Sequence, residues 1–196
     1  MIGAVVLAAG RSTRMGTQKL LLPLGGQPII VSIVDELLIG GLEQIVVVVG
    51  QDGAQIQQVL CGRQVSFVEN YIPGDDMLSS VRCGLRGLPM SCEAILVALG
   101  DQPGTTHELV SGLIRAFRLT NRSLIVPAHE GRRGHPLLFA ACWRDEVLTC
   151  HDGVGLRGLL DSHPDEIFEV AVATGRLLED LDTPEDYQRH LKSTRG

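Results

Sequence analysis

The chain has 196 residues, 44% of them hydrophobic and 20% charged, with a formal net charge of −6. That length suits one domain with a substantial core, over residues 1–196, and the composition excludes disorder and fibrous repeats. The acidic balance argues against a nucleic-acid partner, and no apolar run approaches the roughly 18 residues needed to cross a bilayer, so we expect a cytoplasmic protein with no membrane partner.

In the first half, short apolar runs alternate with amphipathic stretches. Runs that are apolar on both faces and stop at a glycine predict buried parallel strands at 2–8, 44–49 and 95–99. Apolar residues at helical spacing predict a helix over 30–38, which begins after Pro28 and ends before Gly40. Further helices are predicted at 52–61, 77–88 and 107–119. This alternation predicts a doubly wound α/β fold, in which ligands bind at the carboxyl ends of the strands.

The second half is less regular. Strands are predicted at 123–127, 136–139 and 167–172. The polar, glycine-rich segment 128–134 is predicted to be a loop that reaches over an acceptor. A last helix is predicted to start just after Asp182, because Thr183 suits an N-cap, Pro184 the first helical position, and Asp186 completes a capping box.

A glycine-rich segment directly follows the first predicted strand. It reads Leu7-Ala8-Ala9-Gly10-Arg11-Ser12-Thr13-Arg14-Met15-Gly16-Thr17-Gln18-Lys19. Small residues let the backbone approach a ligand, exposed N–H groups can hold phosphate oxygens, and Arg14 and Lys19 supply positive charge. The segment has neither a Walker A pattern nor a dinucleotide-binding fingerprint. Two interpretations remain, a cradle for a triphosphate and a flexible loop with solvated cations.

Two aspartates fall at predicted strand ends. Asp101 follows the strand predicted at 95–99, where a hard oxygen ligand suits Mg²⁺, although Asp101 or Thr105 could instead cap the next helix. Asp182 lies at the start of the last helix, and capping by its neighbours does not explain it. His135, before Pro136, could bind an acceptor or simply hydrogen-bond a neighbouring backbone group.

Six segments, in order along the whole chain, resemble one family. They are LAAGRSTRMGTQKLLLPL at 7–24, MLSSVRCGL at 77–85, GDQP at 100–103, RGHPLLF at 133–139, DGVGLRGLL at 152–160 and DLDTPEDY at 180–187. Together they are similar to the molybdenum cofactor cytidylyltransferases and their close relatives among small nucleotidyltransferases. The resemblance implies a three-layer, Rossmann-like fold with a mostly parallel central sheet. It also implies Mg²⁺-dependent transfer of CMP from CTP to molybdopterin, with release of pyrophosphate.

The resemblance further implies a role for particular residues. The nucleotide would be bound by Leu7, Ala8, Ala9, Gly10, Ser12, Arg14, Gly16, Lys19, Ser80 and Asp101. Catalysis would depend on Arg14, Lys19, Asp101 and Asp182, and both aspartates would be ligands of Mg²⁺. The acceptor side would be lined by Gly134, His135 and Pro136. Ala9 resembles the cytidylyl branch of the family, since the guanylyl branch tends to have glycine there.

Two alternatives remain at this level. One is a related transferase that uses GTP or another nucleoside triphosphate with a sugar or polyol phosphate. The other is a non-catalytic escort protein that delivers cofactor to a molybdoenzyme, and a molybdoenzyme or its chaperone is in any case an expected partner. The two acidic positions, Asp101 and Asp182, favour an enzyme over an escort protein, because a carrier does not need a second carboxylate facing a triphosphate. The base, the acceptor, the oligomeric state and the roles of Asp75 and Asp76 are not fixed by the sequence.

Overall fold

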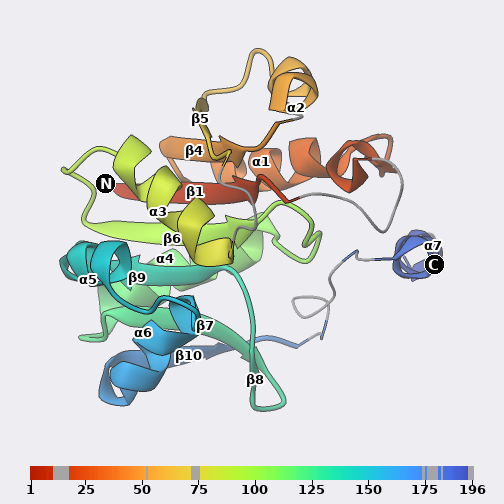
Figure 1. Ribbon diagram of the computed structural model, residues 1–196. Helices are drawn as coiled ribbons and strands as arrows, with labels where there is room; N and C mark the ends of the chain where they lie inside the picture. The colour runs from red at the N-terminus through yellow and green to blue at the C-terminus, as the bar shows by residue number, and fades with distance from the viewer. Residues whose placement is uncertain are drawn as a thin grey trace.

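A central eight-stranded sheet organises the computed structural model, which describes residues 1–10, 18–51, 53–71, 76–173, 175, 181 and 183–193. The strand order is β10-β7-β9-β6-β1-β4-β5, and β8 pairs with β7 (Figure 1). The strands are β1 (Ile2–Ala8), β4 (Gln44–Val49), β5 (Ser66–Glu69), β6 (Ala94–Leu99), β7 (Leu124–His129), β8 (Arg132–Arg133), β9 (Leu137–Ala140) and β10 (Ile167–Ala171). Pairing is parallel except where β9 meets β6 and β7 and where β8 meets β7. The predicted mostly parallel sheet is confirmed.

Helices cover both faces of this sheet. They are α1 (Ile29–Ile39), α2 (Gly53–Val59), α3 (Met77–Gly87), α4 (His107–Leu119), α5 (Arg144–Thr149), α6 (Leu156–Ser162) and α7 (Pro184–Ser193). A short hairpin, β2 (Pro23–Leu24) and β3 (Gln27–Pro28), precedes α1. Within the described residues, no helix combines the length and the apolar character that crossing a bilayer requires.

The two faces of the sheet belong to separate hydrophobic cores because side chains alternate along each strand. Ala4 and Val6 of β1 lie in the core shared with α1 and α4, whereas Val5 lies in the core shared with α3, α5 and α6. Figure 1 shows these two groups of helices on opposite faces. The predicted three-layer α/β fold is therefore confirmed.

The segment predicted as a loop over 128–134 has more structure than expected. β7 continues to His129, and Ala128 and His129 pair with the two arginines of β8. The turn between the strands contains Glu130 and Gly131, with φ of 48° and 76°. Pairing satisfies backbone groups that would otherwise need water, so this polar segment forms a two-stranded arm. The loop prediction is wrong for this part of the chain.

The last helix returns to the N-terminal half of the molecule. Thr183 N donates to Asp186 Oδ2 at 3.1 Å and Asp186 N donates to Thr183 Oγ1 at 3.2 Å, which confirms the predicted capping box. Hydrogen bonds from Thr183 hold the pKa of Asp186 below its ordinary value. Tyr187 Oη donates to the carbonyl oxygen of Pro23 at 2.5 Å. These contacts fix the start of α7 and tie the helix to β2.

Two helical glycines give a matched test of the packing of α3. A Cβ on Gly84 would lie 2.3 Å from Val5 Cγ1 and 3.0 Å from Val48 Cγ2, whereas a Cβ on Gly112 of α4 would meet nothing within 4 Å. We expect Gly84→Ala to lower the free energy of unfolding by about 1–3 kcal/mol, because β-branched neighbours cannot easily move. Gly112→Ala should raise it by up to about 1 kcal/mol. Urea denaturation measures both, and an unchanged Gly84→Ala midpoint would contradict the close packing.

Candidate active site

The backbones of three parallel strands converge where β1 ends. Gly100 N, after β6, donates to the carbonyl oxygen of Leu7 at 3.0 Å, and a Cβ on Gly100 would lie only 2.8 Å from that oxygen. A Cβ on Gly50, after β4, would lie 2.9 Å from the carbonyl oxygen of Ala9. Only glycine allows such close approach. The segment from Leu7 to Gly10 thus lies at the carboxyl edge of the sheet, where the sequence predicts the nucleotide.

Part of the predicted phosphate cradle lies outside the described residues. This applies to Ser12, Arg14 and Gly16, because residues 11–17 are not described. Their roles stay predictions. The described ends of the segment are Gly10, which is exposed, and Gln18, which is half-buried.

Lys19 and Asp101 meet at this edge although 82 positions separate them in the chain (101 − 19). Lys19 Nζ lies 2.5 Å from Asp101 Oδ2, and the two side chains are 16% and 21% exposed. Lys19 begins a short 3₁₀ helix, and Asp101 follows β6. Two residues predicted to serve catalysis are therefore in contact, and Lys19 is not a freely solvated cation.

The cap of α4 decides between the two interpretations of Asp101. Thr106 is the N-cap, and its Oγ1 accepts from Leu109 N at 3.4 Å. Thr105 is buried, and Asp101 is paired with Lys19. The alternative in which Asp101 or Thr105 caps this helix is wrong, so the carboxylate of Asp101 has no structural duty in α4.

Asp182 lies outside the described residues, but its chain neighbours do not. Leu181 N donates to the carbonyl oxygen of Asp101 at 3.4 Å, and the Leu181 side chain is 1% exposed within the core below the sheet edge. Thr183 begins the capping box described above. The backbone on the N-terminal side of position 182 is therefore held against Asp101. The second metal ligand itself stays a prediction.

We expect Lys19→Ala to weaken binding of the nucleoside triphosphate about 10-fold, because one charge-assisted hydrogen bond to phosphate is lost. Nucleotide titration measures the loss, and circular dichroism checks that the fold is intact. Arg63→Ala is the matched control, since Arg63 Nε pairs with Asp35 Oδ1 at 2.6 Å with similar exposure, 25% and 33%. Equal affinity in Lys19→Ala and the wild type would rule out contact with the triphosphate.

Ser80 lies in the first turns of α3 and is held by a residue that the sequence did not predict. Asn70 follows β5 and is 7% exposed, and its Nδ2 lies 3.0 Å from both Ser79 Oγ and Ser80 Oγ. The N–H of Asn70 donates to the carbonyl oxygen of Val49 at 2.9 Å. Asn70 therefore fixes α3 at the carboxyl edge of β4 and β5. The sequence signal for this site was Asn70 itself, a polar residue two positions after the apolar pair at 67–68.

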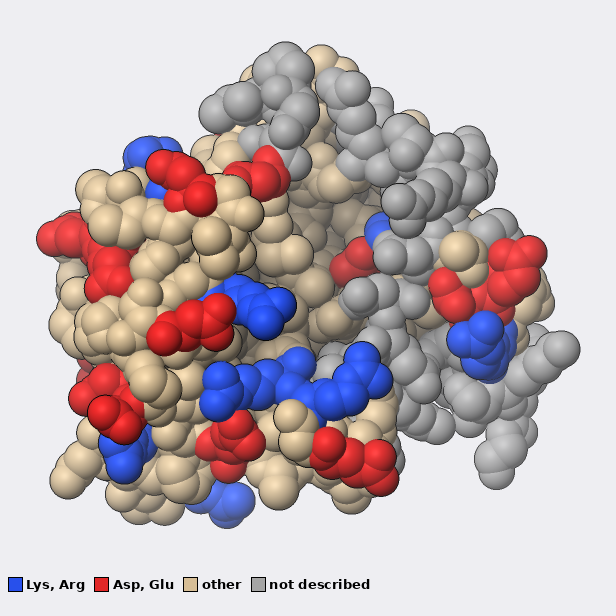
Figure 2. Space-filling view, turned by 60° about the horizontal axis from the view of Figure 1, so that its bottom comes forward, with Lys and Arg blue, Asp and Glu red and all other residues tan. Residues whose placement is uncertain are grey.

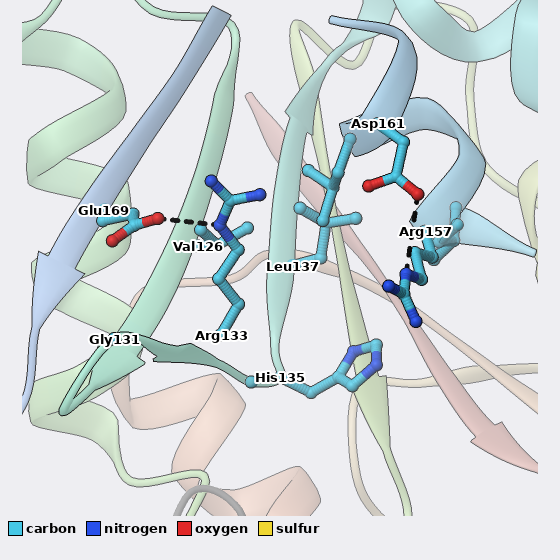
Figure 3. A pocket seen from close by; sticks show the side chains of 11 residues that line it. Val126, Gly131, Arg133, His135, Leu137, Arg157, Asp161 and Glu169 are labelled. Atoms are coloured by element: carbon cyan, nitrogen blue, oxygen red, sulfur yellow. Dashed lines mark hydrogen bonds and ion pairs between the residues drawn. The ribbon is translucent and has the colours of Figure 1, made fainter. Parts of the chain in front are cut away.

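Two of the three predicted acceptor residues line a cavity of about 500 Å³. Gly134 and His135 belong to its wall, and Pro136 adjoins it in the chain. Because β9 runs antiparallel to β6, residues that precede Leu137 lie toward the carboxyl end of β6, from which Asp101 follows. The rest of the wall comes from β7, β8 and the turn between them, β9, β10 and α6 (Figure 3). The cavity thus adjoins the edge that carries Lys19 and Asp101.

A loop over residues 150–155 leads into α6 and is tied to α3 by one guanidinium. Arg82 Nε donates to the carbonyl oxygen of Val147 at 2.9 Å, and its terminal nitrogens contact Asp152 Oδ1 and the carbonyl oxygen of Cys150, both at 2.6 Å. The loop contains Gly153 and Gly155 with φ of 74° and 73°, a conformation that glycine adopts without strain. Arg82 thus connects the helix of Ser80 to the cavity wall.

Glu146 holds the same loop from the other side. Its Oε1 lies 2.8 Å from His151 Nε2, and both its oxygens lie 3.0 Å from His163 Nε2. Burial alone would raise the pKa of Glu146, but hydrogen bonds from His163 and His151 and their charges lower it below its ordinary value. The His163 ring packs on Trp143 with centroids 4.0 Å apart. The carboxylate therefore stays ionised and fixes His151.

Among the described residues, Glu36, His107 and Glu108 form one group of three potential metal ligands, which does not include Asp101. Both ring nitrogens of His107 are already engaged, Nδ1 with Glu36 at 2.8 Å and Nε2 with Glu108 at 3.1 Å. The backbone N–H of His107 also donates to Glu36 Oε2 at 2.5 Å. This group fixes the start of α4 against α1.

Positive side chains gather on the face that carries the cavity. Figure 2 shows a row of Lys and Arg side chains there, beside a hollow in the surface. The exposed arginines of β8 and α6 are Arg132, Arg133 and Arg157. Figure 2 also shows acidic side chains beside this row, and Arg133 and Arg157 are paired with Glu169 and Asp161, so the face is mixed in charge.

This fold and this edge define an enzyme class that binds nucleotides. The backbone of residues 7–10 after β1 lies at the carboxyl edge of a doubly wound sheet, and Lys19 and Asp101 meet at this edge, where such folds bind ligands. The chain belongs to the family of MobA-like NTP transferase domains, whose profile matches residues 4–167, and it is a nucleotidyltransferase.

Individual relatives cover nearly the whole chain. Nicotine blue oxidoreductase of Paenarthrobacter nicotinovorans is 30% identical over 97% of this chain and 96% of its own. Molybdenum cofactor cytidylyltransferase of Escherichia coli K12 is 24% identical over 95% and 93%. A Mycobacterium tuberculosis protein crystallised as a manganese complex is 27% identical, covers 98% of each chain and superposes with a TM-score of 0.82. The resemblance seen in the sequence is confirmed at the level of the family.

Proposed function

We propose that the protein transfers CMP from CTP to molybdopterin and releases pyrophosphate, with Mg²⁺ as its metal. The observation that carries this proposal is the ion pair between Lys19 and Asp101 at the ligand-binding edge of the sheet. Ala9, which is half-buried in the segment after β1, supports a cytidine nucleotide by its resemblance to the cytidylyl branch. The name of the Escherichia coli relative supports the acceptor.

The residues at this edge fit a divalent cation of the hard, oxygen-preferring kind. The carboxylate of Asp101 is partly exposed and already has a cation, the ammonium of Lys19, 2.5 Å from one oxygen. Asp182 would be the second ligand. A bound Mg²⁺ would supply charge neutralisation at the phosphates and orientation of their oxygens. The manganese complex of the Mycobacterium tuberculosis relative supports a divalent ion.

The protein's own groups would then act by positioning and by charge. Lys19 leaves Asp101 for the triphosphate when nucleotide binds, and with Arg14 and the N–H groups of residues 8–10 it stabilises the pyrophosphate as it leaves. An oxygen of the acceptor phosphate attacks the α-phosphorus, and the bond from the α-phosphorus to the bridging β-phosphate oxygen breaks. A phosphate monoester is ionised near neutral pH, so no general base is required.

The acceptor occupies the cavity beside Gly134 and His135 in this proposal. Ser80, fixed by Asn70, lies near the base or ribose. The cavity volume of about 500 Å³ is within the range of small-molecule sites.

The test is pyrophosphate release from CTP, GTP and ATP, each offered with molybdopterin, with a sugar phosphate and with a polyol phosphate, with and without Mg²⁺ or Mn²⁺. Release with CTP and molybdopterin, dependent on the metal, is expected. Release only with another pair would reassign the substrates to the second kind of transferase. No release with any pair would favour a cofactor escort protein.

A second candidate activity follows from the 30% identity to nicotine blue oxidoreductase over the full chain. The same preparation should therefore be assayed for reduction of nicotine blue by an added two-electron donor. Dye reduction without any pyrophosphate release would overturn the transferase proposal in favour of a redox activity.

A further inference from the structure

The cavity beside α6 has an apolar floor and a charged rim. Val126, Leu137 and Leu156 contribute to the floor and are 1%, 2% and 6% exposed. The rim carries Arg133, Arg157, Asp161 and Glu169. Such a site suits a molecule that has both an apolar part and an ionic substituent.

The two arginines of the rim differ in how firmly they are held. Arg133 Nε lies 2.7 Å from Glu169 Oε1, a short charge-assisted contact. Arg157 Nε lies 3.5 Å from Asp161 Oδ2, and these side chains are 83% and 60% exposed. A distance of 3.5 Å is long for a hydrogen bond, and an exposed pair of this kind contributes little. A ligand can therefore take Arg157 from its carboxylate partner more easily than Arg133.

The backbone that carries Arg157 is fixed even though its side chain is exposed. Leu156 and Leu159 are buried in the core shared with α3. Gly158 packs against the ring of His151, because a Cβ there would lie 2.6 Å from His151 Nδ1. In Figure 3, Arg133 and Arg157 lie on opposite sides of Leu137. Arg157 is thus anchored at the rim by its backbone, while its side chain is exposed and has a weak contact with Asp161.

We infer that Arg157 determines specificity for the acceptor by binding its phosphate group, and that Asp161 is the counterion it gives up. The inference rests on the proposed function, because it describes the molecule placed in that cavity. A planar guanidinium matches two oxygens of a phosphate monoester, and the dianion attracts it more strongly than a single exposed carboxylate does. Arg133 stays with Glu169 and maintains the shape of the β8 arm.

The test uses two variants whose expected effects have opposite signs. Phenyl phosphate serves as the probe, since it combines a flat apolar ring with a phosphate dianion, and its dissociation constant is measured by calorimetry at fixed ionic strength. Arg157→Gln should weaken its binding about 10-fold through loss of a charge-assisted hydrogen bond. Asp161→Asn should strengthen it about threefold, because the guanidinium loses its competing carboxylate and repulsion falls. If only the structural ion pair mattered, both variants would change binding alike, and the inference would fail.

Two controls locate the probe. Arg118→Gln removes an exposed arginine from α4, away from the cavity wall, and should leave the dissociation constant within about twofold at this ionic strength. Lys19→Ala should also leave it unchanged if the probe occupies the cavity. A large effect of Lys19→Ala without any effect of Arg157→Gln would place the probe at the triphosphate site and overturn the inference.

Kinetics separate this inference from the proposed function. In the pyrophosphate assay, Arg157→Gln should raise KM for the acceptor about 10-fold and leave kcat and KM for the nucleotide within about twofold, a split that general destabilisation would not produce. Pyrophosphate release with an unchanged acceptor KM in Arg157→Gln would refute the inference alone. If Arg157→Gln and Asp161→Asn change phenyl phosphate binding in opposite directions but no acceptor gives pyrophosphate release, the proposed function is refuted. The phosphate site at Arg157 would then still hold.

Discussion

Replacing Asp101 by alanine lowers kcat for nucleotidyl transfer by about 100-fold or more, in the range found for single electrostatic stabilisers. Among the described residues, the carboxylate of Asp101 is the candidate ligand for a divalent cation. The contact described for this carboxylate is the one with Lys19. Because the side chain acts on charge that develops during transfer, turnover should fall more than nucleotide affinity. Steady-state pyrophosphate release and nucleotide titration measure the two effects separately.

Asp101→Asn keeps the shape of the side chain and removes its charge, so it should lose nearly as much turnover as the alanine variant. Asp35→Ala is the matched control, because it breaks a comparable pair with Arg63 between α1 and the segment after α2. That variant should keep kcat within about twofold of the wild type, since it removes no charge from the site. Wild-type turnover in Asp101→Ala would remove Asp101 from the catalytic groups.

Replacing Arg144 by leucine lowers the free energy of unfolding by about 3 kcal/mol, because buried carbonyl groups lose a charged donor. Arg144 is 4% exposed, and its Nη2 donates to the carbonyl oxygens of Leu85 and Leu88 at 2.6 and 2.7 Å. Those carbonyls belong to the C-terminal end of α3, where helical carbonyls lack partners within the helix. Urea denaturation of the wild type and the variant measures the difference.

Two further variants show whether the guanidinium itself is responsible. Arg144→Lys keeps the charge, but an ammonium group lacks the forked geometry with which the guanidinium reaches both carbonyl oxygens. This variant should therefore recover only part of the lost stability. Arg118→Leu removes an exposed arginine from α4 and should change the free energy of unfolding by no more than about 0.5 kcal/mol. A loss below about 1 kcal/mol in Arg144→Leu would show that water replaces the lost donor.

The sequence predicted the centre of the sheet because the local pattern there carries the information. β1, β4 and β6 are apolar on both faces, which reveals burial between two helical layers without knowledge of the neighbours. β5 escaped prediction because it has only two apolar residues, Phe67 and Val68, which pack against different cores and lie between the exposed Ser66 and Glu69. Because β5 was not predicted, the sequence did not place Asn70 at the end of a strand.

Elements that exist only through long-range contacts were missed for a different reason. β8 consists of Arg132 and Arg133, which have no apolar periodicity and become a strand only because β7 pairs with them. α6 reaches the cavity through contacts of the preceding loop with Arg82, 70 positions from Asp152. The resemblance to the family, not spacing, assigned Gly134 and His135 to the acceptor side, and nothing in the spacing indicated Arg157. Lys19 and Asp101 were chosen because they lie in segments that follow predicted strands.

The reversed direction of β9 has a consequence for how substrate range diverges in such enzymes. In a purely parallel sheet, only the residues that follow each strand lie at the edge where ligands bind. Because β9 is antiparallel, the residues that precede β9 lie at this edge instead. The hairpin that supplies these residues is separate in the chain from the segment after β1 and from the turn after β6. Insertions or deletions in that hairpin would therefore change the cavity wall at Gly134 and His135 and leave the edge with Lys19 and Asp101 intact. Relatives that share this scaffold can in this way differ in the acceptor molecule that they modify.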